Sequence, residues 1–256
     1  MIEVRSLAKR FALGRGRNAR VVDAVRDVSF EAAGGTITGL LGANGAGKTT
    51  TLRIVAGLIA ADSGSALVDG IDVAAAPRAA LARMGVLGDA RGLYPRLTAR
   101  ENIRYFGLLH GLSPDAADAR ASVLAELLDL TPLLDRRTEG FSQGERMKTA
   151  LARALVHDPP NIILDEPTNG LDVMATRALR EALRRLSSEQ GGSRCIVFST
   201  HVMQEVERLC DRVVVIAHGR SVASGTVAAL QEQTGERDFE EAFVRLAFDV
   251  NGAGPR

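Results

Sequence analysis

The chain has 256 residues, of which 46% are hydrophobic and 25% charged, and its formal net charge is +1. This composition is typical of a globular protein, and the near-neutral charge argues against a nucleic-acid partner. The sequence has neither a run of 18 apolar residues nor a signal-peptide core, which predicts a cytoplasmic protein that meets a membrane only through a partner. Cys195 and Cys210 lie in apolar stretches, which predicts buried thiols in a reducing compartment.

The first part of the chain predicts short strands, because β-branched and alternating apolar residues recur there. These predicted strands cover residues 2–7, 20–25, 27–32 and 36–41. The Gly- and Arg-rich stretch 12–20 predicts a hairpin loop whose arginines are either solvated or bind a partner. A helical apolar period covers residues 47–58, and short strands and turns return over 62–87.

Residues 97–157 predict mostly helix, with breaks near Pro114 and Pro132. Beyond them, strands and helices alternate as in βαβ units, with strands at 161–166, 195–200 and 212–217 and helices at 174–189 and 202–209. Two short helical patterns follow Gly225. We therefore predict an α/β domain over 1–225, a helical subdomain at about 90–157, and a C-terminal helical extension and tail over 226–256.

Residues 42–49 match the pattern G-x-x-x-x-G-K-[ST] between a predicted strand and a predicted helix. The glycines let backbone N–H groups converge on phosphate oxygens. Lys48, in a chain that otherwise uses arginine almost throughout, predicts a compact ammonium for the β- and γ-phosphates, and the Thr49 hydroxyl predicts a Mg²⁺ ligand. The predicted nucleotide-binding residues are Gly42, Ala43, Asn44, Gly45, Ala46, Gly47, Lys48, Thr49 and Thr50.

Two acids end the buried strand NIILDE at residues 161–166. Adjacent strand side chains point to opposite faces, which predicts different roles for the two carboxylates. We predict that Asp165 holds Mg²⁺ and that Glu166 polarises the attacking water. His201 ends the next strand, at the sheet edge where ligands bind, which predicts a contact with the γ-phosphate. Asn161 is a departure, because such a strand usually begins with an apolar residue.

A second anion site is predicted at FSQGE, residues 141–145. Ser142 and Glu145 form a capping box at the start of an amphipathic helix. Gly144 in its first turn costs the helix about 1 kcal/mol against Ala, and a bare, glycine-opened helix N-terminus binds anions. One domain then has two predicted anion sites, which calls for an explanation.

Together these motifs resemble the ATP-binding subunits of ABC transporters over nearly the whole chain. The resemblance implies a P-loop NTPase with a RecA-like core, an antiparallel β-subdomain and an inserted α-helical subdomain, with ATP and Mg²⁺ as cofactors. It implies that two copies dimerise head to tail on binding ATP, so that each signature caps the γ-phosphate held by the other copy. On this basis the signature residues Ser142, Gln143, Gly144 and Glu145 act in trans, Phe11 stacks on adenine, and Leu171 and Asp172 cross the dimer interface.

The resemblance also implies a separate integral membrane permease, which would hold the chain at the inner face of the cell membrane. Asp89 stands where the family has a glutamine that touches Mg²⁺ and couples to the permease, and Glu145 stands where glutamine is common. Leu93 and Tyr94 follow in a loop that the resemblance directs toward the permease. Residues 89–103, 140–180 and 199–212 resemble the ATPase subunit of sodium-extruding, two-component exporters of the Nat type.

Three alternatives stay open beside sodium export. One is an exporter of a drug or lipid, since no residue of this chain need touch the substrate. Another is a soluble ABC ATPase acting on DNA or ribosomes, which the single compact cassette and near-neutral charge disfavour. The third is a non-hydrolysing regulatory module, which the presence of Glu166 and His201 disfavours.

Overall fold

A computed structural model describes residues 1–13, 20–88, 92–188 and 192–248. Within these ranges the strands form one sheet in the order β5-β4-β1-β2-β10-β9-β3-β8-β7-β6. The strands are β1 (Ile2–Leu13), β2 (Arg20–Ala32), β3 (Ile37–Leu41), β4 (Ser63–Val68), β5 (Ile71–Asp72), β6 (Met84–Leu87), β7 (Asn161–Asp165), β8 (Cys195–Thr200), β9 (Arg212–Ala217) and β10 (Arg220–Gly225).

The sheet has a parallel part and an antiparallel part. Strands β9, β3, β8, β7 and β6 are parallel neighbours, whereas β2, β1, β4 and β5 pair antiparallel. A single parallel pair, Arg220 with Asp27, joins β10 to β2. The carboxyl ends of the parallel strands therefore meet along one edge, which is where an open α/β sheet binds its ligands.

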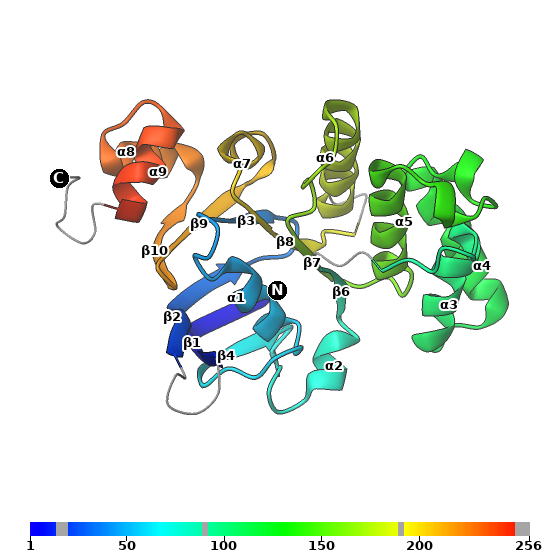
Figure 1. Ribbon diagram of the computed structural model, residues 1–256, viewed down its shortest axis with the longest axis horizontal. Helices are drawn as coiled ribbons and strands as arrows, with labels where there is room; N and C mark the ends of the chain where they lie inside the picture. The colour runs from blue at the N-terminus through cyan, green and yellow to red at the C-terminus, as the bar shows by residue number, and fades with distance from the viewer. Residues whose placement is uncertain (14–19, 89–91, 189–191, 249–256) are drawn as a thin grey trace.

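Helices cover both faces of the parallel strands (Figure 1). The helices of the described residues are α1 (Lys48–Val55), α2 (Pro77–Leu81), α3 (Ala99–Leu109), α4 (Pro114–Leu127), α5 (Gln143–Leu155), α6 (Val173–Ser187), α7 (Met203–Leu209), α8 (Val227–Thr234) and α9 (Phe239–Phe248), with 3₁₀ turns at Thr131–Leu133 and Thr138–Gly140. Helices α3 to α5 gather at one end of the molecule, and α8 and α9 lie at the other.

Strand β7 shows why its sequence is a continuous apolar run. Ile162 and Leu164 pack into the cluster beneath α5 and α6, while Ile163 packs into the cluster around α1 and β1. All five β7 residues are buried, since both faces of the strand are covered. The buried Asn161 is satisfied, because its amide donates to Asp69 Oδ2 at 2.9 Å and to the Arg83 carbonyl at 3.1 Å.

Helix boundaries follow the capping residues. Thr98 and Glu101 form a capping box at the start of α3, and Ser113 caps α4 with Pro114 at the first helical position. The capping box predicted for Ser142 and Glu145 is confirmed, since each side chain accepts a hydrogen bond from the other's backbone N–H.

The structure differs from the sequence-based elements in three places. The predicted strands at 20–25 and 27–32 are one strand, β2, whose partner β1 extends to Leu13, because long antiparallel pairing carries both past the local pattern. Residues 77–81, predicted as strand or turn, form the short helix α2, which Pro77 opens.

Cys195 is buried as predicted, and burial raises the pKa of its thiol to about 11, whereas Cys210 is half-buried.

Candidate nucleotide site

The loop between β3 and α1 has the backbone shape of a phosphate cradle. Gly45 and Gly47 have φ angles of 80° and 109°, which are left-handed values that favour glycine. A Cβ atom on Gly47 would lie 2.6 Å from the Ala24 carbonyl oxygen, so a side chain there would collide with β2. At Gly45, in contrast, a Cβ atom would meet nothing within 4 Å, and the loop is open on that side.

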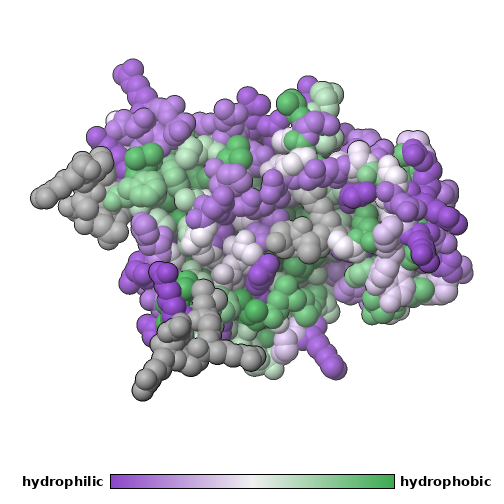
Figure 2. Space-filling model, in the orientation of Figure 1, coloured by the Kyte–Doolittle hydropathy of each residue, from purple (hydrophilic) through white to green (hydrophobic). Residues whose placement is uncertain are grey.

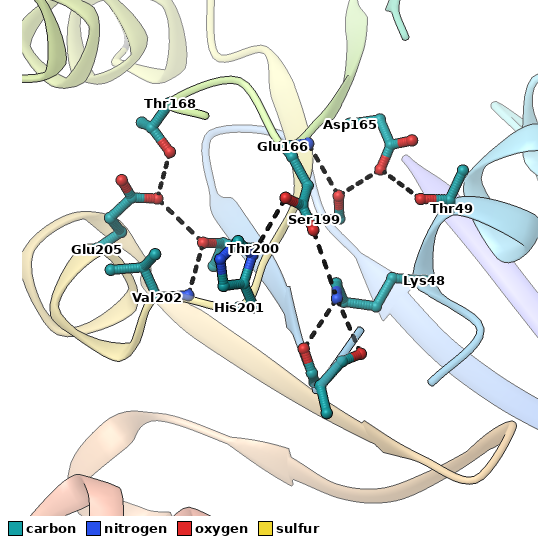
Figure 3. A network of polar contacts seen from close by, with 12 residues as sticks. Lys48, Thr49, Asp165, Glu166, Thr168, Ser199, Thr200, His201, Val202 and Glu205 are labelled. Atoms are coloured by element: carbon teal, nitrogen blue, oxygen red, sulfur yellow. Dashed lines mark hydrogen bonds and ion pairs between the residues drawn. The ribbon is translucent and has the colours of Figure 1, made fainter. Parts of the chain in front are cut away.

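Lys48 places its ammonium inside this loop. Its Nζ donates to the carbonyl oxygens of Gly42 at 2.8 Å and Ala43 at 3.2 Å and lies 3.6 Å from Glu166 Oε1 (Figure 3). Burial lowers the pKa of Lys48, and the neighbouring Glu166 carboxylate opposes that shift. The loop thus holds a cation at the position where a triphosphate would bind. Phosphate oxygens would then replace the carbonyl oxygens as the partners of Lys48.

Thr49 and Asp165 meet across 116 residues of sequence. The Thr49 hydroxyl donates to Asp165 Oδ1 at 3.0 Å, and the Ser199 hydroxyl donates to the same oxygen at 2.5 Å. A hydroxyl beside a carboxylate at a phosphate loop is the donor pair that Mg²⁺ uses in P-loop proteins. These two side chains therefore fit a Mg²⁺ ion bound together with a nucleotide.

Glu166 lies beyond the end of β7 and has a left-handed φ of 45°. Its Oε2 is 3.1 Å from His201 Nδ1, and its backbone N–H donates to Ser199 Oγ at 3.0 Å. Strand alternation, which predicts opposite faces for the two acids, does not extend to Glu166. The turn at Glu166 instead brings both carboxylates against the first residues of α1, as Figure 3 shows.

Ser199 and Glu205 belong to this network although the sequence analysis did not select them. Ser199 contacts both acids, and the signal for it in the sequence is a small hydroxyl directly after the apolar run of β8. Glu205 on α7 is buried and accepts hydrogen bonds from Thr168 at 2.7 Å and Thr200 at 3.0 Å. In the sequence Glu205 looks like a solvated helix residue, because the two threonines that pair with it, Thr168 and Thr200, lie outside α7.

Comparison with known proteins bears directly on this constellation. The profile of the ABC transporter family matches residues 25–169, which include the phosphate loop, the signature and both acids. The chain belongs to the ABC transporter family. It is 43% identical over 226 residues, 88% of this chain and 91% of the other, to the ABC transporter ATP-binding protein NatA of Bacillus subtilis.

Two further comparisons place the chain among ATP-binding subunits. It is 44% identical over 208 residues, 80% of this chain and 67% of the other, to the Nod factor export ATP-binding protein I of Paraburkholderia xenovorans. A solved ATP-binding subunit of an ABC transporter superposes with a TM-score of 0.80 at 30% identity, covering 96% of this chain and 98% of that one. The chain is thus an ATP-hydrolysing subunit of an ABC transporter with the ABC ATPase fold, as predicted.

In this ABC ATPase the signature lies apart from the phosphate loop of its own chain. Gln143 Nε2 donates to the Asn169 carbonyl at 3.1 Å, and Ser142 and Glu145 bond each other. Among the described residues, no hydrogen bond or ion pair joins the signature to residues 42–50. The structure therefore brings together the phosphate loop, the two acids and His201, and leaves the signature out of that group.

The segment after the acids presents apolar side chains at the surface. Leu171 is partly buried against the main core, and Asp172 caps α6 by accepting the Ala175 N–H at 2.8 Å. Val173 and Met174 follow, with exposed fractions of 80% and 72%. Adjacent large apolar side chains this exposed are typical of an interaction surface, and the interface residues predicted from the sequence end at Asp172, directly before them.

Phe11 lies apart from the contacts of this network among the described residues. Phe11 is half-buried on β1 opposite Val22, with Lys9 Nζ 5.7 Å from its ring centroid. Asp89 and the two residues after it lie outside the described residues, as does most of the Gly/Arg loop.

A groove of about 730 Å³ opens beside the signature helix. Its lining includes Leu93, Pro95, Phe141, Gln143 and Arg146. Between Leu93 and Pro95, the backbone of Tyr94 is anchored by the buried Asn102, whose Oδ1 accepts the Tyr94 N–H at 2.9 Å and whose Nδ2 donates to the Tyr94 carbonyl at 3.1 Å.

Among the described residues, no helix has both the length and the apolar composition that a membrane span requires.

Proposed function

We propose that this ATPase drives the export of small cations, sodium first, through a separate membrane permease. The observation that carries the proposal is the similarity to NatA, at 43% identity over 88% of this chain. The stretches 89–103, 140–180 and 199–212, which resemble sodium-extruding exporters of the Nat type, include residues outside the catalytic network and so support more than a shared ATPase chemistry.

The network supports the following division of labour. The loop amides and Lys48 bind the phosphates, with Thr50 and Phe11 completing the nucleotide site. Mg²⁺ held by Thr49 and Asp165 would neutralise charge on the phosphate oxygens when bound. Glu166 orients the attacking water and accepts its proton, a role that contributes about 10²–10⁴-fold to the rate. His201, 3.1 Å from Glu166, holds that carboxylate and contacts the γ-phosphate.

Two copies of the chain form the working ATPase in this proposal. The separation of the signature from its own phosphate loop leaves the Ser142 hydroxyl and the Gly144 N–H without a nucleotide in the same chain. A head-to-tail homodimer formed on ATP binding supplies one and gives the second anion site its purpose. The exposed Val173 and Met174, next to Leu171 and Asp172, fit a surface that a partner subunit covers.

The permease docks in the groove beside the signature helix. Leu93, Pro95 and Phe141 give the groove apolar walls, while Arg146 and Glu139 supply polar ones. Tyr94 is 46% exposed, and its ring meets that of Tyr105 edge to face with centroids 5.5 Å apart. Such a mixed groove suits an amphipathic cytoplasmic helix of a membrane protein. This partner would hold the subunit on the inner face of the cell membrane.

A drug or lipid substrate is the second candidate, and a specific observation favours it. The relative from Paraburkholderia xenovorans is named for Nod factor export and is 44% identical over 80% of this chain, compared with 43% over 88% for NatA. The ATPase site is therefore compatible with cargoes of different chemistry.

The test is the sodium content of cells lacking this gene and that of its permease. We expect these cells to accumulate Na⁺ and to grow poorly in salt. Tyr94→Asp should reproduce the defect without lowering the ATP affinity of the isolated subunit, because a charge between the groove residues Leu93 and Pro95 disturbs docking and leaves the phosphate loop intact. Val123→Asp is the matched control, since Val123 on α4 is 53% exposed and neither lines the groove nor adjoins in sequence a residue that does. Unchanged sodium with accumulation of a drug or lipid would reject the sodium assignment.

A further inference from the structure

The phosphate loop rests on the turn between β9 and β10. His218 and Gly219 form this two-residue hairpin turn, with φ angles of 50° and 76° and Ala217 paired to Arg220. The Gly219 N–H donates to the Ala46 carbonyl in the loop at 3.0 Å. A Cβ atom on Gly47 would lie only 3.5 Å from the Gly219 Cα, so the two backbones are in direct contact.

Strand β2 fixes the same turn from the other side. The Gly219 carbonyl accepts the backbone N–H groups of Arg26 at 2.7 Å and Asp27 at 3.1 Å. Any displacement of the turn therefore changes the support of the last residues of the phosphate loop.

Helix α9 covers the outer side of this turn. The Phe248 ring meets the His218 ring nearly perpendicularly, at 6.3 Å between centroids, and meets Phe243 at 6.5 Å. A small cavity of about 120 Å³ separates α9 from the loop and is lined by residues 43–46, by the end of β9, and by Phe243, Ala247 and Phe248. Apolar side chains gather over α8 and α9 at this end of the molecule (Figure 2).

The inner face of α9 is firmly packed. Phe239, Ala242 and Phe243 are buried in one cluster with Leu41 at the end of β3 and with Val213 and Val215 of β9. Helix α9 thus packs on β9 and β10, which carry the turn, and shares a buried cluster with the end of β3, which leads into the phosphate loop. Phe248, at its last turn, is 47% exposed, and its ring contacts are with His218 and Phe243.

We propose that α9 is a brace that holds the phosphate loop ready for ATP, with Phe248 and His218 as its positioning residues. Residues 43–45 of the loop are exposed, and ordering them on binding would cost conformational entropy. A turn held from three sides (by β2, by the loop and by α9) removes part of that cost before ATP arrives. Since α9 lies outside the Glu166 and His201 network, the brace acts on ATP affinity and not on the chemical step.

The test compares variants in the full-length protein. Phe248→Ala should raise the Kd and KM for ATP about fivefold, the order expected for losing two aromatic edge contacts. The kcat at saturating ATP should change less than twofold. Phe248→Tyr keeps the ring and should keep wild-type affinity. Val244→Ala is the matched control, because Val244 is exposed on the same helix and does not line the cavity.

His218→Asn tests the contact between the Phe248 and His218 rings from the other side chain. Asparagine tolerates a left-handed backbone, so the turn is kept while the ring contact is lost. We expect the same rise in Kd for ATP, measured well below the melting temperature of each variant. An unchanged ATP affinity in both Phe248→Ala and His218→Asn would overturn the proposal, even if Tm falls. An equal loss of affinity in Phe248→Tyr and Phe248→Ala would also overturn it.

Discussion

Glu166 combines a left-handed backbone with two ionisable neighbours. Its φ of 45° costs a non-glycine residue on the order of 1 kcal/mol, and the hydrogen bond from its N–H to Ser199 Oγ helps to hold it there. In return the carboxylate lies between the Lys48 ammonium and the His201 ring, 3.6 Å and 3.1 Å away. Strain at one residue thus places a carboxylate where neither β7 nor its alternation would have put it.

Glu166→Gln should abolish turnover while ATP binding survives. The amide cannot accept the proton of the attacking water, so we expect a loss of at least about 10²-fold in ATP hydrolysis. Binding depends on Lys48, Thr49 and the loop amides, and the variant should elute from size exclusion as a dimer only when ATP is present. Retention of more than about a tenth of wild-type hydrolysis would remove Glu166 from this role.

At the scale of secondary structure, a pair of histidines joins the ends of two helices to the sheet. His110 ends α3 and His157 follows α5, and their rings stack with centroids 3.7 Å apart and planes 4° apart. His157 Nε2 donates to the Met84 carbonyl of β6 at 3.1 Å. Burial, with the neighbouring His110, lowers the pKa of His157 from 6.5 to about 4. Burial beside His110 therefore keeps the His157 ring neutral, although its hydrogen bond to Met84 opposes the shift.

Acid should weaken the fold through His157. Because its pKa is lowered by folding, the unfolded chain binds more protons between pH 6.5 and 4. The free energy of unfolding falls as pH drops through that window, by about 2 kcal/mol at pH 5 from this group. His157→Gln should lose this part of the decline, measured by urea unfolding at pH 7.5 and 5.0. Equal declines in the wild type and the variant would contradict the assignment.

At the scale of the whole molecule, the two predicted anion sites lie apart from each other. The phosphate loop, both acids and His201 converge at the carboxyl edge of the parallel strands, whereas the signature opens α5 beside the groove. In the proposed head-to-tail dimer, each chain supplies half of each site, so that two identical chains complete two such sites.

Mixing two inactive variants tests this division. Ser142→Arg disables the signature and Lys48→Ala the phosphate loop, so a heterodimer has one site with both defects and one site with neither. We expect partial ATPase activity in the mixture, although each variant alone is inactive. Heterodimers should first be demonstrated with two affinity tags, and one intact site must suffice for turnover. A mixture as inactive as its parents would then argue that the signature does not act in trans.

Several features of this protein could be predicted from the sequence because they depend on neighbours along the chain. The glycines of the phosphate loop, the capping box of Ser142 and Glu145, and the apolar run of β7 each specify local backbone geometry within a few residues. The order of these motifs along the chain was enough to predict the family and, with it, the class of cofactor.

Tertiary structure decided the rest, because those features join residues far apart in sequence. The contact of Thr49 with Asp165 spans 116 residues, that of Thr168 with Glu205 spans 37, and α9 meets the β9–β10 turn that supports the phosphate loop. The helix α2 and the fused strand β2 likewise departed from the local pattern. Pairing and burial outweigh local propensity at such positions, since their free energies come from partners that a local window of sequence does not contain.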